Sequence, residues 1–150
     1  MLRQYLAGLA AVILLQACSV SGPANTDAEP VSREGAGLAG SRWQLVAIQF
    51  MNDTALAPDD AAKYTLDFGA DGRAAMRADC NRGSGSWQSA APGQLGFGPI
   101  AATRAMCPPA SISDRYLAQF EWVRSYVLRD GRLYLATEAD GAILEFAPAP

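Results

Sequence analysis

The sequence predicts an α+β fold, a mostly antiparallel sheet of about seven strands with one packed α-helix. Short runs of alternating apolar and polar residues recur along the chain, as they do in half-buried strands. Asp-Gly pairs, a strong hairpin signal, occur at 71–72, 130–131 and 140–141. One amphipathic stripe lies at about 112–124, and we expect it to form the helix.

Strands dominate the first half of the predicted domain. RWQLVAIQF (42–50) alternates at first and changes its pattern near Val46, which predicts a strand with a bulge. After a loop at 51–63, YTLDF (64–68) alternates throughout. Further strands are predicted at 73–81, 84–89 and 94–100, separated by short turns.

The helix and a C-terminal meander complete the predicted fold. Ser111 or Ser113 can cap the helix, after a loop that contains two adjacent prolines. The helix is expected to lie on the sheet through Ile112, Tyr116, Leu117, Phe120 and Val123. The last strands are expected at 125–129, 132–137 and 142–146. We expect strands that are neighbours in sequence to pair.

Residues 1–17 (MLRQYLAGLAAVILLQA) have the features of a secretory signal. The positive charge of Arg3 precedes an apolar run that is too short to cross a hydrocarbon core of about 30 Å. The end of the run, LQAC, resembles the bacterial lipobox, in which Cys18 is acylated and becomes the new N-terminus. The alternative is a buried N-terminal helix with Cys18 in the core.

A lipoprotein signal predicts both the location and the organisation of the chain. Membrane lipid would be a partner through acylated Cys18, since two or three acyl chains anchor a protein stably. Ser19 favours the outer membrane, with the domain facing the periplasm. Residues 18–40 are rich in Ser, Gly, Pro and Ala and are expected to form a flexible tether. The domain is then expected at 41–147.

The composition argues against several functional classes. Half of the 150 residues are hydrophobic, 18% are charged, and the net charge is −3. This acidic balance lacks the basic stripe of nucleic-acid-binding proteins, so no nucleic acid partner is expected. The chain contains no histidine, so a Ser-His-Asp or Cys-His catalytic site cannot be assembled from it alone. We expect no catalytic residues, no metal site and no cofactor.

Cys80 and Cys107 remain once Cys18 is assigned to the lipid. A disulfide between them is the interpretation we favour for a chain exported to an oxidising compartment. Two free buried thiols are an alternative. A zinc site or a catalytic thiol is disfavoured, because histidine ligands and a histidine base are absent.

Two motifs occur in order, Cys-Asn-x-x-x-Gly-x-aromatic at 80–87 and Thr-Arg-x-x-Cys at 103–107. With the tryptophan strand that opens the domain and the C-terminal LYLATEADGAILEF, they resemble the META domain family, which includes HslJ-like envelope lipoproteins. The resemblance implies a curved, partly open β-barrel with a packed helix, similar to a secretin pilot lipoprotein. It also implies a loose link to stress and antibiotic tolerance, without an established catalytic activity.

The resemblance also suggests roles for single residues. It supports the Cys80–Cys107 bridge and implies that Asn81, Gly83 and Gly85 shape a turn after Cys80, where positive φ angles are required. Trp87 is the motif aromatic, while Thr103 and Arg104 belong to the second motif. Trp43, Trp87 and Trp122 are expected in the core or at the barrel mouth.

Arg82 and Arg104 are the candidate ligand-binding charges, with Asn81 and Trp87 beside them. The bridge would bring the two guanidinium groups close enough to receive one carboxylate or phosphate. The alternative is that Arg104 pairs with Asp79 or with loop carbonyl groups.

These features predict a non-enzymatic envelope lipoprotein that binds a protein, peptide or apolar ligand and supports envelope integrity or tolerance of stress and antibiotics. One alternative is a hydrolase that uses the carboxylates of Asp67 and Asp79. Another is an inhibitor or pilot chaperone of one envelope protein. The partner is therefore an unidentified envelope protein or small ligand, and we expect a monomer.

Cys18→Ala is expected to give a protein that acquires no label when cells grow with radioactive palmitate, because the acylated thiol is gone. Autoradiography of the purified protein checks this. Label that persists in the variant would contradict the lipobox interpretation.

Overall fold

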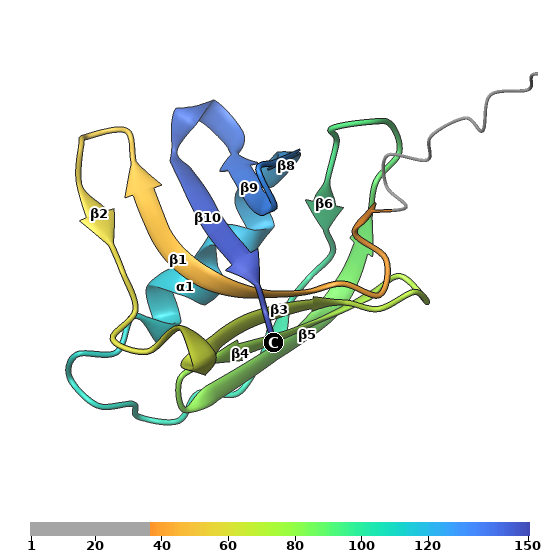
Figure 1. Cartoon of the computed structure of the whole chain (residues 1–150). Coiled ribbons are helices and arrows are strands. Elements are labelled where there is room, and N and C mark those ends of the chain that lie inside the picture. The colour runs from red at the N-terminus through yellow and green to blue at the C-terminus, as the bar shows by residue number, and fades with distance from the viewer. Residues whose placement is uncertain (1–36) are drawn as a thin grey trace, which may run out of the picture.

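The computed structural model describes residues 37–150, in which a curved sheet packs against a short helix (Figure 1). The predicted signal peptide, the lipidation site at Cys18 and the tether up to residue 36 lie outside the described residues. Residues just before the predicted domain start already belong to the fold. Leu38 is fully buried, and the amide of Gly40 donates a hydrogen bond to the carbonyl of Phe68 at 2.7 Å.

The described residues form ten strands in one antiparallel sheet. The strands are β1 (Arg42–Phe50), β2 (Ala55–Leu56), β3 (Tyr64–Phe68), β4 (Arg73–Ala78), β5 (Asn81–Gln88), β6 (Gly96–Phe97), β7 (Ala101–Ala102), β8 (Val123–Arg129), β9 (Arg132–Thr137) and β10 (Ala142–Pro148). The helices are η2 (Ala61–Lys63), α1 (Ser113–Gln119), η3 (Phe120–Trp122) and η4 (Glu138–Asp140), of which only α1 is an α-helix.

Strand β1 joins the two halves of the sheet. Most strands pair with a sequence neighbour, as expected, in the order β6-β5-β4-β3-β1-β10-β9-β8. Strand β1 pairs with β2 and β3 and also with the last strand, β10, and β7 pairs with β5 instead of a sequence neighbour. The β1–β10 register shifts between Leu45 and Ala47, which confirms the predicted bulge at Val46. A bulge bends its strand and increases the local twist, so it helps the sheet to curl.

The sheet curls until its two ends nearly meet. The segment before β6 reaches β8, where the amide of Leu95 donates to the carbonyl of Arg124 at 3.1 Å. Close by, the amide of Tyr126 donates to the carbonyl of Gly93 at 2.9 Å. These contacts produce a nearly closed barrel with one short α-helix, which confirms the predicted fold class.

The interior of the barrel is a packed apolar core. Alternation along the strands sends every second side chain inward, and Leu45, Leu66 and Phe146 are among those with no exposed surface. The helical segment contributes Tyr116 and Phe120, whose rings meet edge to face at 5.1 Å. Full burial of side chains of this size contributes about 1.5–3 kcal/mol each. These side chains fill the space inside the barrel.

The helix is shorter than predicted. α1 ends at Gln119, η3 continues it by one turn, and Val123 already begins β8, so the prediction of helix to residue 124 is wrong. Val123 is buried as the first residue of β8, where it pairs with Thr137 of β9. Trp122 is 50% exposed and is therefore not a core residue. None of the helices within residues 37–150 is both long and apolar enough to span a bilayer.

Several predicted strands also have different limits. The strand predicted at 84–89 is β5 and begins three residues earlier, at Asn81. The strand predicted at 73–81 ends at Ala78, because Asp79 takes the left-handed conformation with φ of 55° and turns the chain. Aspartate adopts the left-handed conformation more readily than most residues. The turn therefore needs no glycine, and the sequence gives no glycine signal for it. The strand predicted at 94–100 contains only β6, since the glycines and Pro99 interrupt pairing before β7 begins.

Candidate functional site

A disulfide joins the β4–β5 turn to the loop that precedes α1. The sulfur atoms of Cys80 and Cys107 are 1.99 Å apart and the Cα atoms are 5.5 Å apart, as in an ordinary disulfide. The predicted bridge is therefore confirmed against the alternative of two free thiols. It fixes the C-terminal end of the loop at 103–107 to the barrel wall.

The side chain of Asn81 holds the rest of this loop. Asn81 is only 1% exposed, and its amide oxygen accepts hydrogen bonds from the backbone of Ala105 at 2.7 Å and from the hydroxyl of Thr103 at 2.9 Å. Its amide nitrogen donates to the carbonyl of Ala105 and the hydroxyl of Ser113, both at 3.1 Å, and approaches the sulfur of Cys107 at 3.2 Å. A buried amide is costly unless it is satisfied, and these bonds satisfy it.

Thr103 extends the pairing of β7 with β5. Its amide donates to the carbonyl of Arg82 at 2.9 Å, and its hydroxyl accepts from the amide of Arg82 at 3.0 Å. The same hydroxyl bonds to Asn81, so the threonine links the loop to two successive residues of β5. The two sequence motifs are thus two sides of one hydrogen-bonded junction.

The motif glycines do not form a turn, so that prediction is wrong. Asn81, Gly83 and Gly85 all lie within β5, and none is among the residues with positive φ. Gly83 and Gly85 are needed instead because they have no Cβ, which lets neighbouring segments approach the β5 backbone closely. A Cβ at Gly83 would lie 3.0 Å from Leu117, and one at Gly85 would lie 2.7 Å from Ile100. Helix α1 and the segment before β7 can therefore pack directly on β5.

Trp87 has a structural position. Its indole nitrogen donates to the carbonyl of Gly69 at 3.0 Å, and its ring meets Phe68 edge to face at 5.1 Å. The residue is half-buried against the core, as expected for the motif aromatic. Trp43, with 7% of its surface exposed, is likewise a core residue.

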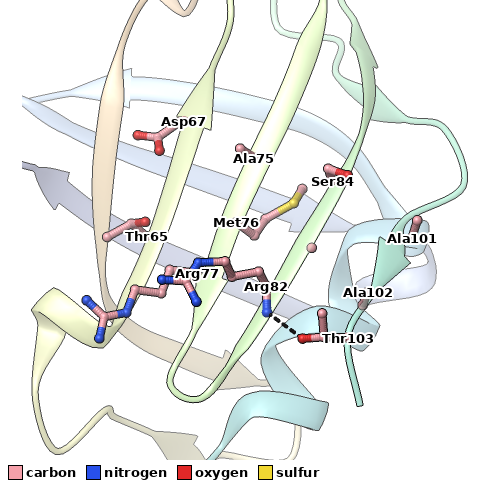
Figure 2. A pocket seen from close by; sticks show the side chains of 11 residues that line it. Thr65, Asp67, Ala75, Met76, Arg77, Arg82, Ser84, Ala101, Ala102 and Thr103 are labelled. Carbon is pink, nitrogen blue, oxygen red and sulfur yellow. Dashed lines mark hydrogen bonds between the residues drawn. The ribbon is translucent and has the colours of Figure 1, made fainter. Parts of the chain in front are cut away.

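A groove of about 580 Å³ crosses the outer face of β3, β4, β5 and β7 (Figure 2). We call it the arginine groove. Small side chains form its floor, and Arg77 and Arg82 cross its lower end. The hydroxyl-bearing residues of the groove are Thr65, Ser84 and Thr103. Figure 2 shows Arg82 extending over β4 toward Arg77, with which it pairs in register across the hairpin.

The positive charge of the arginine groove is not neutralised within residues 37–150. Arg82 makes no side-chain hydrogen bond or ion pair there, and Arg77 makes one hydrogen bond, to the carbonyl of Ala62 at 3.3 Å. Asp67 also lines the groove, but it is paired with Arg42 at 2.5 Å. Like charges opposite each other on paired strands destabilise a sheet. A bound anion would relieve that repulsion.

Lys63, unlike Arg77 and Arg82, has its charge neutralised by an ion pair. It pairs with Asp59 at 2.6 Å, and this hydrogen bond, followed by the attraction between the two charges, raises the pKa of Lys63. Arg77 and Arg82 are the cations that line the arginine groove, and neither forms an ion pair within residues 37–150.

Arg104 does not join Arg82. It lines a second hollow, between α1 and the segment 99–104, together with Asp114 and Glu121. Ala102 and Thr103 line both hollows and form the wall between them. The alternative partner, Asp79, forms no ion pair with Arg104. The two arginines that sequence reasoning placed together therefore belong to different surfaces.

The comparisons with known proteins agree with this fold. The model of the META domain matches residues 36–150. The chain belongs to the META domain family. No curated protein matches the chain.

Solved structures similar to this META domain are proteins whose titles state no function. One is the NMR structure of a protein from Burkholderia xenovorans, which is 25% identical to this chain and has a TM-score of 0.63. The match covers 76% of this chain and 85% of the Burkholderia chain. A DUF4847 family protein from Bacteroides vulgatus ATCC 8482 is 14% identical to this chain and has a TM-score of 0.55. The match covers 75% of this chain and 95% of the Bacteroides chain. The second likeness concerns the fold alone.

Sequence reasoning missed Arg77 as a site residue of the META domain. The signal was present in β4, RAAMRA, where alternation places Arg73, Ala75 and Arg77 on the outward face. What the sequence lacked was the register that sets Arg77 opposite Arg82. Among the described residues no cluster of three or more His, Cys, Asp or Glu side chains is arranged to hold a metal ion.

Cys80→Ser and Cys107→Ser are each expected to lower the free energy of unfolding by about 3–4 kcal/mol, because the bridge constrains the unfolded chain. The double variant should be no less stable than either single variant, since both changes remove the same bond. Denaturant unfolding measures all three. Clearly additive losses would contradict a bridge between these two residues.

Proposed function

We propose that this protein is a non-catalytic, lipid-anchored component of the bacterial cell envelope that holds an anionic group of a partner molecule in the arginine groove. In this proposal acylated Cys18 fixes the protein to the outer membrane, and binding by the META domain supports envelope integrity under stress or antibiotics. The partner is an envelope protein, peptide or small molecule that carries a phosphate or carboxylate.

The observation that carries this proposal is the pair of arginines facing each other across the β4–β5 hairpin. Arg77 and Arg82 pair in register, and no carboxylate within residues 37–150 forms an ion pair with either of them. Guanidinium groups bind phosphate and carboxylate through directed hydrogen bonds. The hydroxyl groups of Thr65 and Ser84 line the same groove and can add neutral hydrogen bonds.

Binding on the outer face is favoured over binding inside the barrel. The interior is occupied by large side chains, including the fully buried rings of Tyr64, Tyr116 and Phe120. An apolar ligand would have to displace these packed groups, which would cost the contacts they make. The outer groove needs no such rearrangement, and its charge favours an anion.

The positions of the candidate acids support a role without catalysis. Asp67 is occupied by its ion pair with Arg42 on the outer face of β3. Asp79 lies in the β4–β5 turn, where its amide donates to the carbonyl of Lys63 at the start of β3. Asp67 lies four residues further along the chain than Lys63, or about 13 Å in an extended strand. The two carboxylates therefore do not converge on one scissile bond.

An anion titration tests the proposal. The full mature chain with Cys18→Ser is titrated with inorganic phosphate while its backbone amide signals are followed by NMR. We expect shifts at Arg82, Ser84 and Thr103, and about tenfold weaker binding in Arg77→Gln and Arg82→Gln, the loss of one charge-assisted hydrogen bond of roughly 1.4 kcal/mol.

Arg129→Gln is the matched control, because Arg129 lies on β8, with its guanidinium 5.1 Å from the ring centre of Tyr134 and away from the groove. It should bind phosphate like the unchanged chain. Equal affinity in all three variants, or shifts confined to other surfaces, would refute anion binding in the groove.

A further inference from the structure

A second hollow of about 560 Å³ lies between helix α1 with η3 and the segment 99–104. We call it the helix pocket. One wall carries Ile100 and Thr103, the other carries Leu117 and Ala118, and it does not depend on Arg77 or Arg82. The helix pocket is thus a separate surface that the proposed function leaves unused.

The helix wall presents two carboxylates on one face. Asp114 and Glu121 are seven residues apart, close to two helical turns, so they point to the same side with about 11 Å between them along the axis. Leu117 lies between them and lines the same pocket, half-buried. The wall therefore alternates an acid, an apolar patch and a second acid.

The opposite wall supplies one positive charge. Arg104 lines the pocket from a loop that is held on both sides of it, because Asn81 bonds to Thr103 and to Ala105. Among residues 37–150 its guanidinium pairs with neither Asp114 nor Glu121. Opposite charges thus face one hollow without neutralising each other.

Arg124, three residues after Glu121, is already paired. Arg124 donates to the backbone carbonyl of Glu121 at 2.9 Å, but its guanidinium pairs with the carboxylate of Glu138 at 2.6 Å. The helix pocket therefore has two acids and one base, and a complementary ligand has two ammonium groups, one carboxylate and an aliphatic part.

From this arrangement we propose that the helix pocket binds a free dibasic amino acid. Its carboxylate lies against Arg104, where two parallel hydrogen bonds can form. Its α-ammonium group lies beside Asp114, its aliphatic chain packs on Leu117, and its side-chain ammonium group reaches Glu121. A simple anion is repelled by the two acids, and a simple cation leaves Arg104 unmatched.

Free L-lysine is the test ligand, with lysinamide, which lacks the carboxylate, and norleucine, which lacks the side-chain ammonium group. The full mature chain with Cys18→Ser is titrated at neutral pH and followed by amide NMR. We expect lysine to shift Ile100, Leu117 and Ala118, and both analogues to bind about three- to tenfold more weakly, the effect of one lost charge pair.

Two variants assign the contacts. Arg104→Gln should remove the preference for lysine over lysinamide but keep the preference over norleucine, and Glu121→Gln should do the reverse. Arg115→Gln, on the same helix but outside the pocket lining, should keep both preferences. None of these side chains holds the fold through an ion pair, so the variants should keep the amide spectrum of the folded chain.

Either of two results would overturn the proposal: no shift of pocket amides by lysine, or preferences that survive unchanged in both variants. Shifts of the arginine groove alone would also overturn it, because Arg77 and Arg82 do not line this pocket. Failure of phosphate to bind the groove would leave the lysine titration fully interpretable, so the two proposals can fail separately.

Discussion

The carboxamide of Asn81 is the interaction on which both candidate binding surfaces depend. It is buried, and its bonds run to the loop at 103–107 and to the first residue of α1. Ala102 and Thr103 form the wall shared by the arginine groove and the helix pocket. The position of this wall therefore depends on the hydrogen bonds by which Asn81 holds the loop. The disulfide secures the other end of the same loop.

Structure and binding are divided between neighbouring positions of β5. Alternate residues Asn81, Gly83 and Gly85 turn toward the loop, the helix and Ile100, where a larger side chain would collide. The residues between them, Arg82 and Ser84, face outward into the arginine groove. The period of two along a strand explains how one short motif can serve the core and a ligand surface at once.

Local patterns predicted the long strands well, because alternation and Asp-Gly turns depend only on nearby residues. The pairing of β1 with β10 and the opposition of Arg77 and Arg82 depend on register between strands, which no local pattern encodes. Arg82 and Arg104 were placed together since the bridge joins their loops. Arg82 lies on β5 and lines the arginine groove, whereas Arg104 follows β7 and lines the helix pocket, so the two side chains do not meet.

The central claim is that Asn81 positions the shared wall, and amide hydrogen exchange tests it most directly. Exchange is measured in the oxidised chain and in Asn81→Ala, with the amide of Leu45 in the core as reference. Loss of the bond at 2.7 Å should make the Ala105 amide exchange about ten- to a hundredfold faster, with a far smaller change at Leu45. Unchanged protection of Ala105 in the variant would contradict the account.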